Sequence, residues 1–145
     1  MTTTVRKILA QKGSTLFTMD PERSVFEALE LMSKEGVGSV LVTRGDKLLG
    51  IFTERDYARK IALQGRRSRE SRLEDLMTRE LLTVHPNDTL EHCMAIITTK
   101  HFRHLPVVED GKLLGIVTIG DVLKAVIETQ ASAIEELNRY ISGAS

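Results

Sequence analysis

Two short motifs of the same form carry the residues of this chain best suited to binding a ligand. They run Gly50-Ile51-Phe52-Thr53-Glu54-Arg55-Asp56 and Gly115-Ile116-Val117-Thr118-Ile119-Gly120-Asp121. In each motif an apolar run typical of a strand ends at a threonine, where a helix is expected to begin. A helix start presents free N–H groups that attract phosphate, and a carboxylate in its first turn can accept hydrogen bonds from ribose hydroxyls. The motifs therefore favour a nucleoside phosphate as ligand.

Helix capping is a simpler interpretation of the same residues. A threonine before a helix and an acid three residues later satisfy free N–H groups and favour the helix dipole. One such motif alone would indicate only a cap. Its recurrence strengthens the ligand-binding interpretation, and the sequence leaves both open.

The motifs belong to a longer internal repeat with an offset of 65 residues. Segments 42–56 and 107–121 are identical at eight of fifteen positions, without a gap. A repeat of this length predicts two copies of one structural unit, related by an approximate two-fold axis. Such an axis would create paired clefts between the copies.

Each copy is predicted to contain a strand, a helix, two further strands and a second helix, which is an α/β fold of the α+β type. The apolar spacing of Val25, Ala28, Leu29 and Met32 predicts the first helix, and Cys93 lies on the corresponding face in the second copy. We therefore expect a buried, structural thiol. The predicted strands are 16–19, 40–43, 48–53, 81–84, 105–108 and 113–118.

Three segments lie outside the copies. Val5, Ile8 and Leu9 predict a short amphipathic N-terminal helix, whose apolar stripe is expected to be left over by the core of the copies. The polar stretch 64–72 predicts a surface linker. The last helix is expected to run from about residue 120 to 141, with an apolar stripe longer than one copy can cover. Such a stripe usually packs against another helix or another subunit. The predicted division is 1–13 N-terminal helix, 14–64 first copy, 65–73 linker, 74–128 second copy and 129–145 C-terminal helical extension.

Composition narrows the class of protein. Lys and Arg number 20, as do Asp and Glu, and the pI is about 6.9, so no net charge favours nucleic acid or an anionic membrane. One cysteine permits no disulfide within the chain and fits a reducing compartment. No apolar run reaches about 20 residues, and no signal peptide is evident. We expect a cytoplasmic protein.

No arrangement of residues predicts a metal centre or a catalytic site. The histidines between 85 and 104 do not have the spacing of a dense ligand cluster, and Cys93 is expected in the core. No paired carboxylates, nucleophile with its base, or phosphate-loop lysine is present. The chain is therefore predicted not to be an enzyme and to bind no metal.

The tandem pattern, the strand His104-Leu105-Pro106-Val107-Val108 and the two threonine–aspartate motifs resemble a pair of cystathionine β-synthase (CBS) domains, or Bateman module. The resemblance covers roughly residues 10 to 128. It implies two β-α-β-β-α repeats about a pseudo-two-fold axis, and a homodimer in which two pairs form a disc. It also implies binding of AMP, ADP, ATP, NAD(H) or S-adenosylmethionine. Some small free-standing bacterial proteins consist of such a pair alone, and we expect this chain to be one of them.

By position, the resemblance implies two clefts, each lined by both copies. In the first, Asp121 would hold the ribose, Thr118 would lie near the phosphate and Ile116 beside the adenine. Its wall would add Ser14, Thr15, Val37, Gly38 and Ser39. The second cleft would use Asp56, Thr53, Ile51 and Arg55 against Leu82, Thr83, Phe102, Arg103 and His104.

The second cleft has more positive charge than the first. Arg55 and Arg103 stand where the other copy has Gly120 and Gly38. These arginines would favour a longer phosphate chain or a dinucleotide; alternatively, both are solvated surface residues.

The sequence thus predicts a regulatory module that binds AMP, ATP or NAD(H) and transmits occupancy to an unidentified effector protein. One alternative is a nucleotide-independent interaction scaffold that acts through its terminal helices. Another is an unrecognised enzyme acting on a nucleotide. The scaffold hypothesis predicts that partner binding does not depend on nucleotide, and the enzyme hypothesis predicts turnover of the nucleotide.

Overall fold

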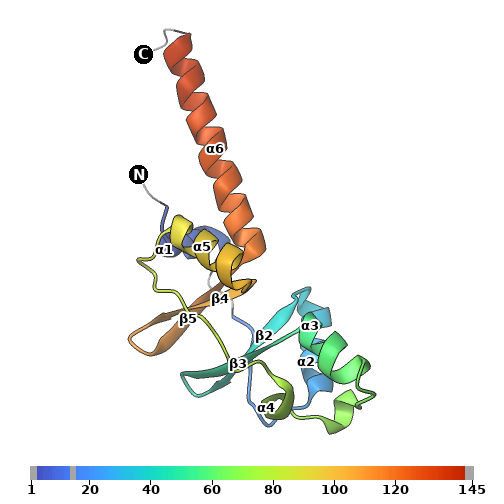
Figure 1. Cartoon of the computed structure of the whole chain (residues 1–145). Coiled ribbons are helices and arrows are strands. Elements are labelled where there is room, and N and C mark those ends of the chain that lie inside the picture. The colour runs from blue at the N-terminus through green and yellow to red at the C-terminus, as the bar shows by residue number, and fades with distance from the viewer. Residues whose placement is uncertain (1–2, 14–15, 143–145) are drawn as a thin grey trace. The chain divides into compact units, whose positions relative to one another are not determined.

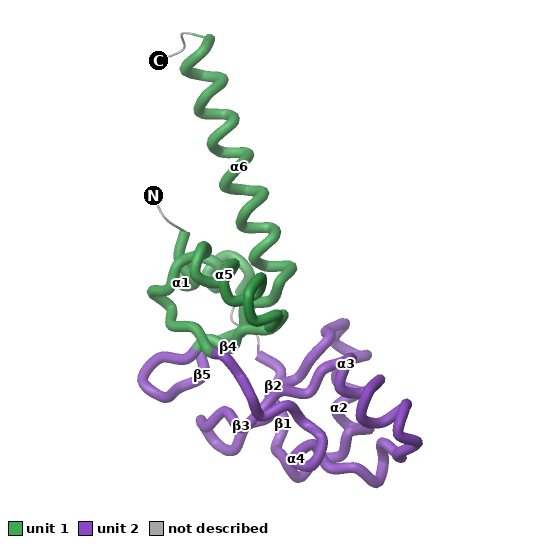
Figure 2. Tube along the Cα trace, viewed as in Figure 1, with its two compact units in different colours: residues 1–14, 83–107, 115–145 green, residues 15–82, 108–114 purple. Residues whose placement is uncertain are grey.

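The structure is a computed structural model that describes residues 3–13 and 16–142 (Figure 1). The chain divides into two compact units (Figure 2). Unit 1 comprises residues 1–14, 83–107 and 115–145, and unit 2 comprises residues 15–82 and 108–114. Each unit therefore combines segments that are distant in the sequence, and the N-terminal helix groups with the second copy of the repeat.

Unit 2 contains a three-stranded sheet in the order β1-β2-β3, formed by β1 (Thr18–Met19), β2 (Ser39–Arg44) and β3 (Lys47–Thr53). Strands β1 and β2 are parallel, and β2 and β3 form an antiparallel hairpin. The helical elements of the unit are α2 (Val25–Glu35), α3 (Glu54–Asp56), a π-helical continuation (Tyr57–Ala62), a 3-10 turn (Ser68–Glu70) and α4 (Leu73–Leu76).

Unit 1 contains three helices, α1 (Val5–Lys12), α5 (Leu90–Lys100) and α6 (Ile119–Ile141). The hairpin of β4 (His104–Glu109) and β5 (Lys112–Thr118) begins and ends in this unit, while its turn, 108–114, belongs to unit 2.

Equivalent residue pairs show that both copies of the repeat have the same strand pairing. Met19 pairs with Val42 in parallel, and Val84 pairs with Val107 in parallel. Both members of the second pair lie 65 residues after those of the first. The predicted hairpins and helices are thus confirmed, but the strand predicted over 81–84 is reduced to this single bridge.

The core of unit 2 lies between α2 and the sheet. Ser24 is the N-cap of α2 and forms a capping box with Glu27: the Ser24 hydroxyl accepts from the Glu27 backbone N–H, and the Glu27 carboxylate accepts from the Ser24 backbone N–H. The spacing of apolar residues then turns Val25, Ala28 and Met32 inward, where they join Phe52 in a buried cluster. The α2 face is therefore covered within the unit.

The N-terminal helix is also covered within its own unit, which differs from our expectation that its apolar stripe is left over. Val5 and Ile8 are buried. Backbone hydrogen bonds hold the helix start, from Val5 N to Asp88 O (2.9 Å), from Arg6 N to Pro86 O (2.8 Å) and from Leu90 N to Thr3 O (2.8 Å). Leu9 packs against Gly115, where the missing Cβ leaves room for its side chain.

Cys93 is fully buried on α5, as predicted. Burial, with a smaller contribution from the charge of Asp88, raises the pKa of its thiol to about 11. A thiol with this pKa stays protonated near neutrality and is a poor nucleophile. The structural interpretation of Cys93 is therefore supported.

None of the helices in the described part of the chain has the length and apolarity needed to cross a lipid bilayer. In the same residues, no group of three or more His, Cys, Asp or Glu side chains is placed to hold a metal ion.

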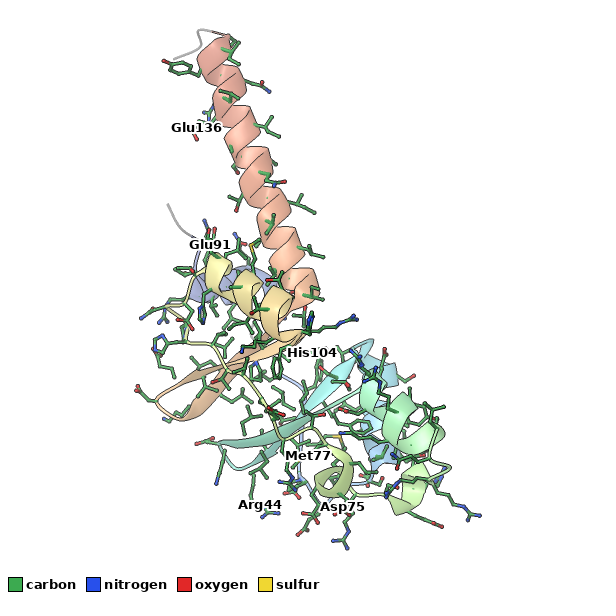
Figure 3. All side chains as sticks on the ribbon, in the orientation of Figure 1. Arg44, Asp75, Met77, Glu91, His104 and Glu136 are labelled. Carbon is green, nitrogen blue, oxygen red and sulfur yellow. The ribbon has the colours of Figure 1, made fainter. Side chains whose placement is uncertain are left out.

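Gly50 offers a test of the packing between β3 and α4. A Cβ at this position would lie 2.8 Å from both Met77 Sδ and the Thr78 carbonyl oxygen, and Figure 3 shows Met77 beside α4. We expect Gly50→Ala to lower the free energy of unfolding by about 1–3 kcal/mol, because the backbone of Thr78 must move. Urea unfolding measures the change.

The matched control is Gly120→Ala in the first turn of α6, where the added Cβ meets only Thr118 Oγ1 at 3.7 Å. Alanine favours a helix over glycine by up to about 1 kcal/mol, so this variant should be as stable as the parent or more so. Equal stability of the Gly50→Ala protein and the parent would contradict the packing.

Candidate functional site

The two threonine–aspartate motifs form the same local structure, one in each unit. Thr53 ends β3 and Thr118 ends β5, and each is the N-cap of the helix that follows. The backbone N–H of Asp56 donates to Thr53 Oγ1 (3.1 Å), and that of Asp121 donates to Thr118 Oγ1 (3.3 Å). Each carboxylate in turn accepts from the backbone N–H of its threonine, at 3.0 and 2.9 Å. The capping interpretation is therefore confirmed at both sites.

Each helix start is also tied to the loop that precedes the hairpin of its own copy. Glu54 N–H donates to the Gly38 carbonyl oxygen (3.1 Å), and Ile119 N–H donates to the Arg103 carbonyl oxygen (3.0 Å). Gly38 and Arg103 are equivalent in the repeat. Each unit therefore brings together a loop residue, a threonine cap and an aspartate.

Asp56 is the more enclosed of the two aspartates. Its residue is 7% exposed, and hydrogen bonds reach both carboxylate oxygens. Oδ2 accepts from Thr53, while Oδ1 accepts from Thr78 Oγ1 (2.9 Å) and forms an ion pair with Lys60 Nζ (3.1 Å). Lys60 also donates to the Leu76 carbonyl oxygen. The carboxylate thus joins α3 to the segment that follows α4.

Asp121 has a more open carboxylate. Its side chain is 20% exposed, and the hydrogen bonds from Thr118 and the ion pair with Lys12 Nζ (2.6 Å) all reach Oδ2. In the part of the chain that the structure describes, no hydrogen bond to Oδ1 is formed. Lys12 Nζ also donates to the Ile116 carbonyl oxygen (2.8 Å), so one lysine contacts two of the predicted site residues.

The charge state of Asp121 is set by opposing effects. Partial burial disfavours its ionised form, but the hydrogen bond and charge of Lys12, together with the hydrogen bonds from Thr118, outweigh burial and lower its pKa. Asp121 is therefore an anion near neutral pH, with one oxygen available to accept hydrogen bonds. A ribose hydroxyl pair requires such an acceptor.

A shallow hollow between α1 and α6 adjoins this carboxylate. Lys12, Asp121 and Lys124 are among the residues that line it. Glu128 also lines the hollow, so two lysines face two carboxylates there, and the remaining positive potential comes from the N-terminus of the 23-residue helix α6. The arrangement therefore places lysine side chains and a helix N-terminus next to a hydroxyl acceptor.

Comparison with known proteins agrees with this geometry. The family model described as the CBS domain matches twice, at residues 5–63 and 73–128. The chain belongs to the CBS-domain family. CBS pairs are regulatory modules that bind adenosine-containing ligands.

Individual CBS proteins show how far the similarity extends. The mitochondrial CBS domain-containing protein CBSX3 of Arabidopsis thaliana is 36% identical over 97% of this chain and 73% of its own length. The crystal structure of the CBS-domain containing protein ATU1752 from Agrobacterium tumefaciens superposes with a TM-score of 0.80, at 40% identity over 85% of this chain and 98% of that one. The crystal structure of CBSX2 in complex with AMP superposes with a TM-score of 0.72, at 29% identity over 88% of this chain and 98% of that one.

The remaining residues predicted for the CBS clefts are distributed over both units. Val37, Gly38, Ser39, Ile51, Arg55 and Leu82 belong to unit 2, and Thr83, Phe102, Arg103, His104 and Ile116 belong to unit 1. Arg55 and Arg103 are exposed, whereas Ile51 is buried. Ser14 and Thr15 lie outside the described residues. Grouping these residues into clefts shared by the two copies stays a prediction.

Three contact residues were missed by the sequence analysis: Lys12, Lys60 and Thr78. Lys60 follows Asp56 by four residues on one helix, so its ion pair could have been anticipated. Lys12 comes from the segment that precedes the first copy, and Thr78 comes from the start of the second copy; Gly13 is the repeat equivalent of Thr78. Only the long-range packing of those segments brings Lys12 and Thr78 to the aspartates.

The different environments of the CBS aspartates predict different effects on stability. Asp56→Ala should lower the free energy of unfolding by about 2–4 kcal/mol, because Lys60 and Thr78 lose their acceptor in a buried site. Asp121→Ala removes a partly exposed cap and should lower the free energy of unfolding by only about 1–2 kcal/mol. Urea unfolding of both variants provides the comparison, and equal losses would contradict the described burial.

The Lys12 ion pair predicts a change in titration. We expect Lys12→Met to raise the pKa of Asp121, because an opposite charge and a hydrogen bond are lost. In the parent, the lowered pKa contributes stability above the ordinary aspartate pKa near 3.9, and this contribution disappears as the pH falls through the folded value. NMR of the carboxyl carbon follows the titration directly. Lys7→Met on the same helix is the control, and an identical Asp121 pKa in all three proteins would disprove the pairing.

Proposed function

We propose that this protein is an adenine-nucleotide sensor that binds AMP, ADP, ATP or NAD(H) and passes the bound state to an effector protein. The observation that carries the proposal is the Asp121 carboxylate. It is ionised, held at the start of α6 by Thr118, and has one oxygen that accepts no hydrogen bond from the residues that the structure describes. The AMP complex of the related CBSX2 supports an adenosine-containing ligand.

Within this proposal, the two motifs are not equivalent. The Asp121 site offers an acceptor oxygen and nearby lysines, whereas the oxygens of Asp56 already accept hydrogen bonds from Thr53 and Thr78 and form an ion pair with Lys60. A ribose at Asp56 would have to displace some of these bonds, and hydrogen bonds to a charged group contribute roughly 1.5–3 kcal/mol each. We therefore assign the tighter ligand site to Asp121, although Arg55 adds charge beside Asp56 in the sequence.

Lys12 connects the Asp121 ligand site to the rest of unit 1. The lysine lies at the end of α1 and holds Asp121 at the start of α6 in an ion pair. A ribose that hydrogen-bonds Asp121 competes for this carboxylate, and a phosphate beside α6 provides Lys12 with another anion. Exchange of partners by Lys12 would alter how α1 is held against α6. The size of the response is limited by the ligand's differential affinity for the two arrangements.

Calorimetry with AMP tests the proposal. The parent should bind AMP more tightly than GMP, and Asp121→Ala should weaken AMP binding by roughly tenfold or more, because the ribose hydroxyls lose a charged acceptor. Ligand at about 100 times its dissociation constant should stabilise the parent by about 2.7 kcal/mol. Lys7→Met serves as a surface control on α1 and should bind as the parent does.

The scaffold hypothesis is the second candidate, because α6 carries a row of exposed apolar residues. It predicts an AMP affinity that Asp121→Ala leaves unchanged, or no binding by the parent at millimolar AMP. Either result would overturn the sensor assignment. Conversion of the nucleotide during incubation, followed by chromatography, would instead indicate an enzyme.

We further propose that the protein is a homodimer in a reducing compartment. The apolar row on α6 supports self-association. The N-terminal helix gives no such support, since Val5 and Ile8 are buried in unit 1. The predicted cytoplasmic location is part of this proposal, and the related CBSX3 is a mitochondrial protein.

A further inference from the structure

The outer part of α6 has no packing partner in its own unit. After Ala125 and the half-buried Val126, every described residue of the helix is exposed. Figure 1 shows this part of α6 extending beyond α1 and α5, and Figure 3 places Glu136 on it. A segment of about 15 residues is at the limit of what forms a stable helix alone in water. Residues 127–141 therefore gain stability from any surface that covers them.

A continuous apolar stripe runs along this segment. The exposed fractions are 56% for Leu123, 64% for Ile127, 60% for Ile134, 57% for Leu137 and 73% for Ile141. At 3.6 residues per turn, all five side chains fall within about 40° of one line along the helix. The stripe is thus one face and not a scatter of single apolar residues.

The stripe points away from the part of α6 that packs on unit 1. Val122 and Ala125 are buried, and Ala125 and Ser132 line a hollow together with residues of α1. Ser132 lies about 180° from Leu123 around the helix. Unit 1 therefore cannot cover the stripe without turning α6 over.

We infer that this stripe is the seam of a parallel, two-stranded coiled coil formed with α6 of a second copy of this chain. The inference deepens the proposed homodimer by naming its interface, and it does not depend on nucleotide binding. The spacing follows a heptad: Leu123 and Leu137 occupy d positions, and Ile127, Ile134 and Ile141 occupy a positions. Isoleucine at a with leucine at d favours two parallel strands.

The residues beside the seam are compatible with α6 of a second copy as the partner. The positions that flank it, e and g, include Ala131 and Ala133, which let two backbones approach, and no like charges oppose each other there across the outer turns. The charged residues Glu128, Glu135 and Arg139 lie at outward positions. Gln130, at a d position, is the single polar residue on the seam.

Cysteine cross-linking of the full chain tests both the interface and its direction. Ile127→Cys and Ile141→Cys are introduced singly, and each protein is treated with oxidised glutathione. Native Cys93 is fully buried, so the parent provides the background. In a parallel, in-register seam each residue faces its own copy, and both variants should form covalent dimers. The control Ser132→Cys, on the opposite side of α6, should stay at the background level.

Four results would overturn the inference. Cross-links that form only when the Ile127→Cys and Ile141→Cys proteins are mixed would show an antiparallel pair. Equal cross-linking of Ser132→Cys would show random collision. If sedimentation of the parent shows a dimer but neither seam variant cross-links, the homodimer stands and its interface lies elsewhere; a monomeric parent would overturn the homodimer as well.

A second variant tests the same interface without introducing cysteines into it. Ile134→Asn combined with Leu137→Asn should raise the dimer dissociation constant by roughly a hundredfold or more, because apolar contacts are lost from both copies. The exposed position Ser132→Asn is the control. Because all of these residues are remote from Asp121, the thermal shift given by AMP should be retained, which separates the interface from the nucleotide site.

Discussion

The reciprocal cap between a threonine at the end of a strand and an aspartate in the first turn of the following helix organises each half of this protein. It fixes where β3 and β5 stop and where α3 and α6 start. It also holds a carboxylate at the positive end of a helix, where its ionised form is favoured. The interaction that stabilises the fold therefore also prepares the group that would bind ribose, so that capping and ligand binding are two uses of one geometry and not competing explanations.

What differs between the halves is how the second carboxylate oxygen is used. In unit 2, Lys60 and Thr78 occupy it and the aspartate is buried as a structural link. In unit 1, the position equivalent to Lys60 is Ala125, and a lysine from α1 reaches the other oxygen instead. A duplicated motif has thus acquired one mainly structural copy and one in which an oxygen accepts no hydrogen bond from the described residues. The same half carries the exposed apolar stripe of α6, which begins at Leu123, two residues after Asp121.

The repeat made much of the fold predictable. An offset of 65 residues placed the hairpins, the capped helices and both aspartates, because each depends on local spacing that recurs. The packing of α1 could not be predicted, because it depends on Leu9 meeting Gly115, more than a hundred residues away. For the same reason Lys12 and Thr78 were missed, although they decide which aspartate is open. The π-helical turn after α3 has no sequence signal that we can identify.

The central claim is that the Asp121 carboxylate recognises the ribose hydroxyls of an adenine nucleotide. Calorimetry with AMP and with 2′,3′-dideoxy-AMP, on the parent and on Asp121→Ala, tests it most directly. The parent should bind AMP roughly tenfold or more tightly than the dideoxy nucleotide, since a hydrogen bond to a charged group contributes about 1.5–3 kcal/mol. In Asp121→Ala this preference should vanish, because the carboxylate that distinguishes the two ligands is gone. A preference of the same size in both proteins would contradict the account.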